Sequence, residues 1–105
     1  MTENNFTATV RLENGAPVLD LQGDINAYAE AALNAAYAEA EKTPAASVTL
    51  NFEKVDYINS TGIALIVGLL AKARAAHRAI IANGLTEHYR EIFTITRLSD
   101  FMEIH

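Results

Sequence analysis

The sequence predicts an α/β fold, a mixed β-sheet of four to five strands with about four helices, mainly on one face of the sheet. Two kinds of pattern predict it. Apolar and polar residues alternate near the start of the chain and again at 48–52, as they do in half-buried strands. Helical segments rich in alanine or in larger apolar residues lie between the later strands. Since 105 residues fit one domain, we expect a single domain over residues 1–105.

The first two strands are predicted to form a hairpin. Every second residue of 6–12 is apolar, which indicates a strand with one buried face. The Glu-Asn-Gly sequence at 13–15 favours a tight turn. The apolar residues of 18–21 then form the second strand, which we expect to end at 23–24.

A first helix and a third strand follow the hairpin. Alanine dominates 27–42, where helix propensity is high, and Asn26 is a candidate N-cap. Pro44 ends this helix. The alternation at 48–52 predicts a central strand, and we expect a loop over 53–58.

A second, long helix is predicted to begin at 59–62, where the capping residue types Asn, Ser and Thr precede a glycine. Residues 63–71 are apolar almost all round, so we expect the first turns to be deeply buried. Gly68 costs about 1 kcal/mol relative to alanine inside a helix. We therefore interpret it as a site of close approach by another backbone, and Gly62 is a second candidate packing glycine.

The C-terminal part is predicted to complete an order β-β-α-β-α-β-α, with a short helix and a strand as optional last elements. Residues 79–82 are a short buried strand, and Thr86 is positioned to cap a third helix. A last helical turn is expected at 98–102 and an edge strand at 102–105. The one-helix connections between the later strands imply right-handed crossovers.

Composition excludes several classes of function. The net charge of −5 argues against nucleic-acid binding, which needs a basic surface. There are no cysteines, so disulfides and thiolate chemistry are excluded. The start of the chain lacks the pattern of a signal peptide, and no apolar stretch approaches the ~20 residues of a membrane span. We therefore expect a cytoplasmic protein without direct membrane insertion.

Three ordered segments resemble the STAS domain family, in its anti-sigma-factor-antagonist form. Residues 55–66, Val-Asp-Tyr-Ile-Asn-Ser-Thr-Gly-Ile-Ala-Leu-Ile, resemble the family's central motif. Residues 23–26 are similar to the Gly-Glu/Asp-Leu-Asp sequence before the family's first helix. Residues 84–93 and 95–98 look like its third-helix segment. The resemblance covers nearly the whole chain and implies a single STAS domain.

The resemblance implies a partner switch without enzymatic activity and without cofactor or metal. In such proteins an anti-sigma factor that is also a serine kinase phosphorylates a serine at the tip of the second helix, and a phosphatase removes the phosphate. The acceptor corresponds to Ser60, with Thr61 as second candidate. The expected partner-binding residues are Asp24, Asn26, Tyr28, Asn59, Ser60, Thr61 and Gly62. A homodimer is a further option.

Two kinds of departure from the family pattern keep other interpretations open. Asn59 and Asn26 stand where aspartate is usual. The change at Asn59 favours a non-switched scaffold subunit of a stressosome-like or lipid-transport ABC complex, and small-ligand sensing is a third option. Arg97 and His77 stand where glycine is common, which we interpret as surface variation.

A structural role competes with the regulatory role of Ser60, because a serine at this place could simply cap the helix. Catalysis by Ser60 is disfavoured, since no Gly-x-Ser-x-Gly elbow surrounds it. His77, His88 and His105 lack metal-ligand spacing, and no glycine-rich phosphate loop with lysine is present.

Overall fold

The computed structural model describes residues 6–105 and contains one five-stranded mixed sheet in the order β1-β2-β3-β4-β5. The elements in chain order are β1 (Thr7–Glu13), β2 (Ala16–Ile25), the 3₁₀ turn η1 (Ala27–Ala29), α1 (Glu30–Ala40), β3 (Ser47–Ile58), α2 (Ser60–Ala75), β4 (Ala79–Asn83), α3 (Glu87–Ile95), the 3₁₀ turn η2 (Leu98–Asp100) and β5 (Glu103–Ile104). β1 and β2 are antiparallel, and the other neighbours are parallel. The predicted fold class and element order are confirmed, including the short final helix and strand.

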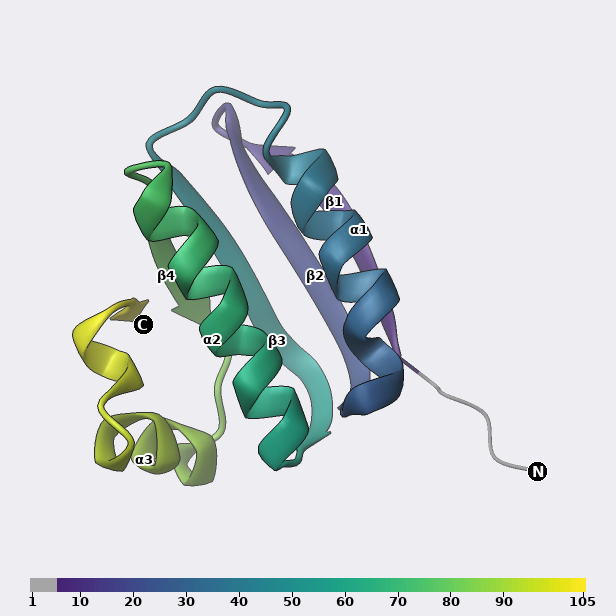
Figure 1. The fold of residues 1–105 in the computed structure, drawn as a ribbon, viewed down its shortest axis with the longest axis vertical. Helices are drawn as coiled ribbons and strands as arrows, with labels where there is room; N and C mark the ends of the chain where they lie inside the picture. Colours follow the sequence, from purple (N-terminus) through teal and green to yellow (C-terminus); the bar gives the residue numbers. More distant parts are fainter. Residues whose placement is uncertain (1–5) are drawn as a thin grey trace.

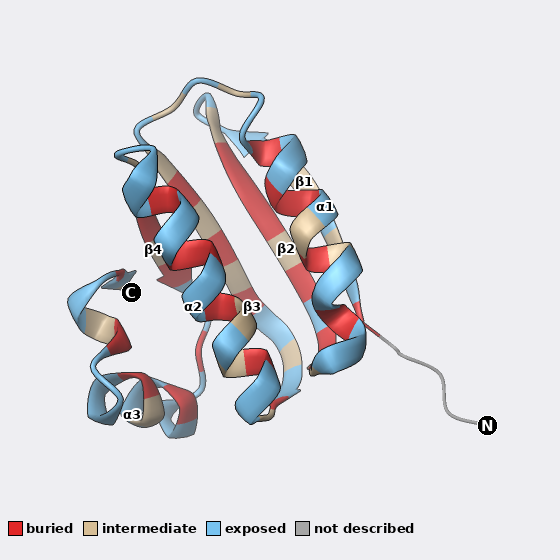
Figure 2. Cartoon of the chain, viewed as in Figure 1, coloured by how far each residue is buried: buried red, intermediate tan, exposed pale blue. Residues whose placement is uncertain are grey.

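The two long helices lie across one face of the sheet (Figure 1). α1 contacts β1 and β2, whereas α2 contacts β2, β3 and β4. Buried residues recur along the strands and on the sides of the helices that face them (Figure 2). The prediction that helices mainly cover one face is therefore confirmed.

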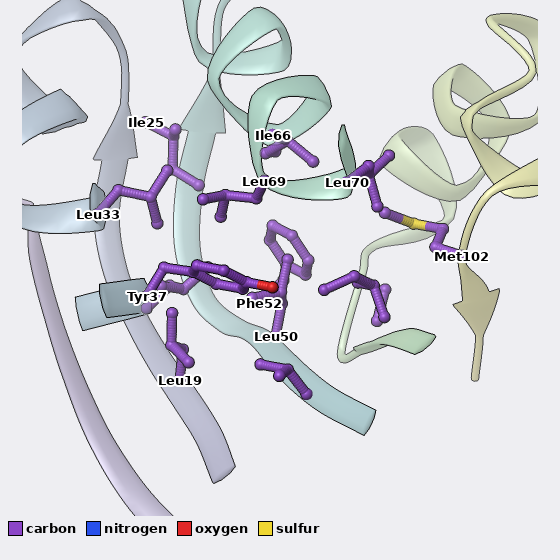
Figure 3. Close-up of a cluster of buried hydrophobic side chains, with 14 of the residues drawn as sticks. Leu19, Ile25, Leu33, Tyr37, Leu50, Phe52, Ile66, Leu69, Leu70 and Met102 are labelled. Atoms are coloured by element: carbon purple, nitrogen blue, oxygen red, sulfur yellow. The ribbon is translucent and has the colours of Figure 1, made fainter. Parts of the chain in front are cut away.

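The core lies between the sheet and these helices. Leu19 and Leu50 of the sheet, and Leu33 and Tyr37 of α1, are at most 1% exposed (Figure 3). Phe93 joins α3 to this core through an edge-to-face contact with Phe52, with ring centroids 6.0 Å apart. Burial raises the pKa of Tyr37, and within residues 6–105 its hydroxyl has no hydrogen-bond partner.

Several boundaries differ from the sequence-based expectation. The helix expected over 27–42 is divided into the 3₁₀ turn η1 (Ala27–Ala29) and α1, which ends at Ala40. β2 continues through 23–24 to Ile25, and β3 runs on to Ile58, so the predicted loop at 53–58 is wrong. The pairing of β2 with β3 shifts between Asp20 and Gln22 and again between Gly23 and Asp24. In each shift β3 contains one residue more than β2, as in a β-bulge. Bulges interrupt strict alternation, which is why the second half of β3 did not look like a strand.

The expected deep burial of the start of α2 is only partly correct. Ile66 and Leu69 are at most 1% exposed, but Val67 is 44% exposed. The interpretation of Gly68 as a site of close packing is wrong within residues 6–105, because a Cβ placed there would meet nothing within 4 Å. α2 thus buries one side and exposes the other, where Val67, Ala71 and Arg74 border an open groove with Leu98 and Phe101.

Three other positions also differ from expectation. Leu12, predicted to be buried with its strand, is 60% exposed because β1 is an edge strand. Arg97 and His77 are exposed, as surface variation implies, but both have left-handed backbone, with φ of 68° and 58°. Glycine adopts this conformation without the strain that a Cβ introduces. The glycines that are common in the family at these two positions are therefore explained by the left-handed backbone, which the sequence did not indicate.

The other face of the sheet carries polar side chains. Asp20 accepts hydrogen bonds from Arg11 Nε at 2.6 Å and from Asn51 Nδ2 at 2.8 Å. The Arg11 hydrogen bond, with help from Asn51, lowers the pKa of Asp20. Within residues 6–105, no helix is long and apolar enough to cross a membrane.

Candidate functional site at the first turn of helix α2

Two segments far apart in the sequence meet where β2 and β3 end. Asp24 pairs with Tyr57 and Ile25 pairs with Ile58 in the parallel ladder. The Asn59 backbone N–H then donates to the carbonyl oxygen of Ile25 at 3.2 Å. The predicted site segments 24–28 and 59–62 therefore lie together at the same end of the sheet, beside the start of both α1 and α2 (Figure 1).

Asn59 is the N-cap of α2. Its backbone is extended, with φ −91° and ψ −176°, and its side-chain Oδ1 accepts a hydrogen bond from the Gly62 N–H at 2.8 Å. Its backbone carbonyl accepts from the Ile63 N–H at 2.9 Å. Because Asn59 fills the cap position, the alternative interpretation of Ser60 as a capping residue is wrong.

Ser60 is the first residue of α2, and both Ser60 and Thr61 are exposed. Within residues 6–105 neither hydroxyl forms a hydrogen bond. The first turn contains no acidic residue. The free N–H groups and the dipole of a helix N-terminus favour negative charge. Ser60 thus combines an accessible hydroxyl with a local field that accommodates a phosphate.

Gly62 fixes the position of this turn. It is buried, and a Cβ built on it would overlap the carbonyl oxygen of Ile25 and lie 2.8 Å from the Ile25 carbonyl carbon. Only a residue without a Cβ permits this approach of helix to strand. Gly62, predicted among the partner-binding residues, therefore positions Ser60 and offers little surface of its own.

The neighbouring segment presents a second exposed surface. Asn26 caps η1, as predicted, with Oδ1 accepting from the Tyr28 N–H at 2.9 Å. The Tyr28 side chain is 75% exposed, and Asp24 is half-buried. Tyr57, which sequence analysis did not assign to the site, is 57% exposed at the end of β3. The sequence left two options open for Tyr57, exposure for binding or inward packing, because the expected loop over 53–58 defines no direction for its side chain.

α3 also supports the site, through a contact that no sequence pattern indicated. The buried Tyr89 hydroxyl accepts a hydrogen bond from the Ile58 N–H at 2.9 Å, directly before Asn59. Thr86 caps α3, as predicted, by accepting from the Tyr89 N–H at 3.3 Å. The last residue of β3 is thus held from α3 as well as from β2.

The Ser60 hydroxyl has no hydrogen-bond partner in the described part of the chain. A nucleophilic serine needs a base within hydrogen-bond reach, and within residues 6–105 no group hydrogen-bonds to the Ser60 oxygen. The same part of the chain contains no cluster of three or more potential metal-ligating side chains. The first turn thus presents an exposed hydroxyl on a helix start that the Asn59 cap and the contact of Gly62 with Ile25 hold in place.

Comparison with known proteins agrees with this geometry. The family model described as "Mlab, STAS domain" matches residues 8–103. The anti-sigma-B factor antagonist of Listeria monocytogenes is 28% identical over 82 residues, which cover 78% of this chain and 72% of that protein.

Solved structures with the same fold include two anti-sigma factor antagonists. The antagonist from Mycobacterium paratuberculosis superposes with a TM-score of 0.77 at 17% identity, over 99% of this chain and 88% of that one. The antagonist SpoIIAA in its unphosphorylated form gives a TM-score of 0.71 at 18% identity, and the match covers 95% of this chain and 86% of that one. The phosphorylated form of Bacillus SpoIIAA gives a TM-score of 0.70 at 19% identity, and the match covers 94% of this chain and 91% of that one.

The relatives are named for antagonism of another protein, which is a binding role, in line with the prediction of a regulator that is not an enzyme. At these identities the solved structures show the fold alone. The family match spans most of the chain, with the exposed serine at the start of α2 inside it. The chain belongs to the STAS domain family, in the group described as Mlab, STAS domain.

Proposed function

We propose that the chain is an anti-sigma-factor antagonist, a partner-switching protein controlled by phosphorylation of Ser60 by an anti-sigma serine kinase. The observation that carries this proposal is the place of Ser60, exposed as the first residue of α2 while Asn59 supplies the cap. The name of the Listeria relative supports the same role. Such a switch would operate in the cytoplasm, where sigma factors act.

The switch would act on the surface and leave the fold unchanged. The kinase would transfer the γ-phosphoryl group of ATP to the Ser60 oxygen, with ADP as leaving group and the hydroxyl proton passing to a kinase base. The phosphate carries about −1.5 to −2 charges at pH 7. Since the Ser60 hydroxyl makes no hydrogen bond within residues 6–105, no internal contact is lost. A phosphatase would hydrolyse the phosphoester and restore the hydroxyl.

The partner would meet the first turn of α2 together with the exposed surface beside it. That surface includes the segment from Asp24 to Tyr28 and the outer side of α2, where Ala64, Val67, Gly68 and Ala71 are exposed. Tyr28 and Tyr57 present large aromatic surfaces, which often dominate binding energy at protein interfaces. A phosphate on Ser60 would force a closely docked partner to desolvate a dianion, which weakens the complex.

Asn59 keeps the structural part of the family's aspartate without its charge. Its Oδ1 makes the capping hydrogen bond to the Gly62 N–H, as an aspartate oxygen would. The missing carboxylate therefore affects recognition by kinase or phosphatase and leaves the helix start intact.

The direct test is incubation of the chain with an anti-sigma serine kinase of its source cell and Mg-ATP, followed by phosphopeptide mass spectrometry. We expect phosphate on Ser60, its loss in Ser60→Ala, and unchanged incorporation in Thr61→Ala. Absence of phosphate from both hydroxyls, together with absence of a complex, would contradict the proposal.

Asn59 also favours a second candidate, a STAS scaffold subunit that binds constitutively in a stressosome-like or lipid-transport ABC complex. Affinity purification from the source cell separates the two roles. Co-purifying transporter subunits, or a very large particle whose composition is the same for wild-type chain and Ser60→Asp, would favour the scaffold.

A further inference from the structure

The outer edge of β1 is long and regular. β1 is the outermost strand and pairs only with β2 among residues 6–105. Its seven residues, Thr7–Glu13, contain no proline or lysine, and their pairing with β2 shows no register shift. The opposite edge strand, β5, has only two residues. Of the devices that protect sheet edges from pairing with another chain, β1 lacks short length, lysine, proline and bulges. Its two charged residues are Arg11 and Glu13, and Arg11 forms an ion pair with Asp20 on the polar face of the sheet.

Apolar surface adjoins this edge on the side of the sheet that α1 covers. Leu12 is 60% exposed there, on the same side of the strand as Ala8 and Val10. An open groove of about 430 Å³ lies between residues 8–10 of β1 and α1, and it is lined by Ala8, Thr9, Val10, Ala32, Ala35, Ala36 and Glu39. The alanines of α1 leave room for a side chain that approaches from beyond β1.

We propose that β1 pairs antiparallel with β1 of a second copy about a two-fold axis at Val10. This isologous contact joins the two five-stranded sheets into one continuous sheet, with the helices of both copies on the same side. The exposed Leu12 of each copy then lies opposite Ala8 of the other, next to the alanine-lined groove. The contact gives the unpaired backbone groups of the edge hydrogen-bond partners.

Charge and strand length select this register. With the axis at Val10, Arg11 lies opposite Thr9 and Glu13 lies opposite Thr7, so no like charges face each other. Each Arg11 is already neutralised by Asp20 at 2.6 Å within its own copy. An axis at Arg11 would place two guanidinium groups opposite each other, which is destabilising. An axis at Thr9 would pair 7–11 alone, whereas the axis at Val10 uses the whole strand.

The absence of cysteine makes a single introduced cysteine the only thiol in the chain. Opposed residues of antiparallel strands have Cα atoms about 4.5–5.5 Å apart, within the range of about 4.4–6.8 Å that a disulfide bridges. Val10→Cys should therefore cross-link into a covalent dimer under mild oxidation. Arg11→Cys tests the register. With the axis at Val10, the two introduced cysteines at position 11 would lie diagonally across the paired strands, too far apart to form a disulfide. Ile95→Cys, at an exposed position on α3, is the matched control and should not cross-link.

Sedimentation of the unmodified chain gives an independent readout. We expect a concentration-dependent rise from the monomer mass of 11.4 kDa toward twice that value. Leu12→Lys should stay monomeric with an unchanged circular dichroism spectrum, while Ile95→Lys should dimerise like wild type.

Three results would overturn the β1 pairing. They are a chain that remains monomeric at millimolar concentration, a dimer that survives Leu12→Lys, and cross-linking of Arg11→Cys or Ile95→Cys as complete as that of Val10→Cys. None of these readouts depends on Ser60, so a failure of the dimer proposal would not affect the phosphorylation switch, and the reverse also holds. A fourth result would exclude the second copy as the occupant of this edge. In that result another protein binds β1, and the chain by itself is monomeric.

Discussion

The first turn of α2 and its middle differ in how they are held, although each contains a glycine. Gly62 in the first turn is buried against the backbone of Ile25, whereas Gly68 two turns later is exposed, with open space around it. The first turn is therefore fixed by a close contact between helix and strand, and the middle is fixed only by the apolar side chains on its inner face. A partner would meet a precisely placed serine at one end of α2 and the exposed residues Val67, Gly68 and Ala71 along the rest.

The largest expected effect comes from Gly62→Ala. The new Cβ would overlap the carbonyl oxygen of Ile25, and backbone cannot move aside as a flexible side chain can. We expect a loss of about 3 kcal/mol or more in the free energy of unfolding, which exceeds the gain in helix propensity. Urea denaturation measures it. An unchanged midpoint would show that the first turn is not fixed by this contact.

Asn59→Ala should remove the cap hydrogen bond to the Gly62 N–H and cost about 1 kcal/mol. Asn26→Ala is the matched control, since Asn26 caps only the three-residue turn η1, and it should cost less. Asn59→Asp should keep the cap and add a charge that the helix dipole favours by about 0.3–1 kcal/mol. Thermal unfolding of the three variants decides between them. Equal losses for both alanine variants would mean that the first turn of α2 depends no more on its cap than η1 does.

Gly68→Ala should stabilise the chain by up to about 1 kcal/mol, because alanine is the better helix former and has room here. For a chain of this size each kcal/mol of added stability raises Tm by about 4–8 °C. The same variant tests the outer side of α2 as a contact surface. If a partner backbone approaches Gly68 closely, affinity should fall while stability rises. A fall in stability would contradict the open environment of Gly68.

Ser60→Asp should have the smallest effect on stability. Ser60 makes no hydrogen bond within residues 6–105, and a negative charge at a helix N-terminus is favourable by about 0.3–1 kcal/mol. We expect an equal or slightly higher Tm. A clear decrease in Tm would show that charge at this position damages the fold, so that phosphorylation could not act on the surface alone.

Much of the fold was predictable because local patterns agree with it. The hairpin signal at 13–15, the alanine-rich helix and the Asn and Thr caps at Asn26 and Thr86 all act within a few residues. The second half of β3 was not predictable, since its bulges arise from pairing with β2. Likewise, nothing near Tyr89 in the sequence indicates that its hydroxyl reaches the Ile58 N–H, 31 residues away along the chain.

The candidate site was predictable in position but not in the roles of its residues. The sequence predicts Ser60 at the start of a helix. Which of the capping residue types takes the cap position depends on where β3 ends. The difference between Gly62 and Gly68 also comes from tertiary structure, because Ile25 approaches only the first. Tyr57 could be assigned to the site only from the structure, where its pairing in β3 sets the direction of its side chain.

In the proposed switch, Ser60 is read by a partner and is not needed for folding. Its most direct test is calorimetric titration of an anti-sigma serine kinase of the source cell with wild-type chain, Ser60→Ala and Ser60→Asp, with Tm measured on the same samples. We predict that Ser60→Asp weakens binding by at least about tenfold, or about 1.4 kcal/mol, with no decrease in Tm, while Ser60→Ala binds like wild type. Equal affinities for all three chains, or a loss of binding that follows a loss of Tm, would contradict this role of Ser60.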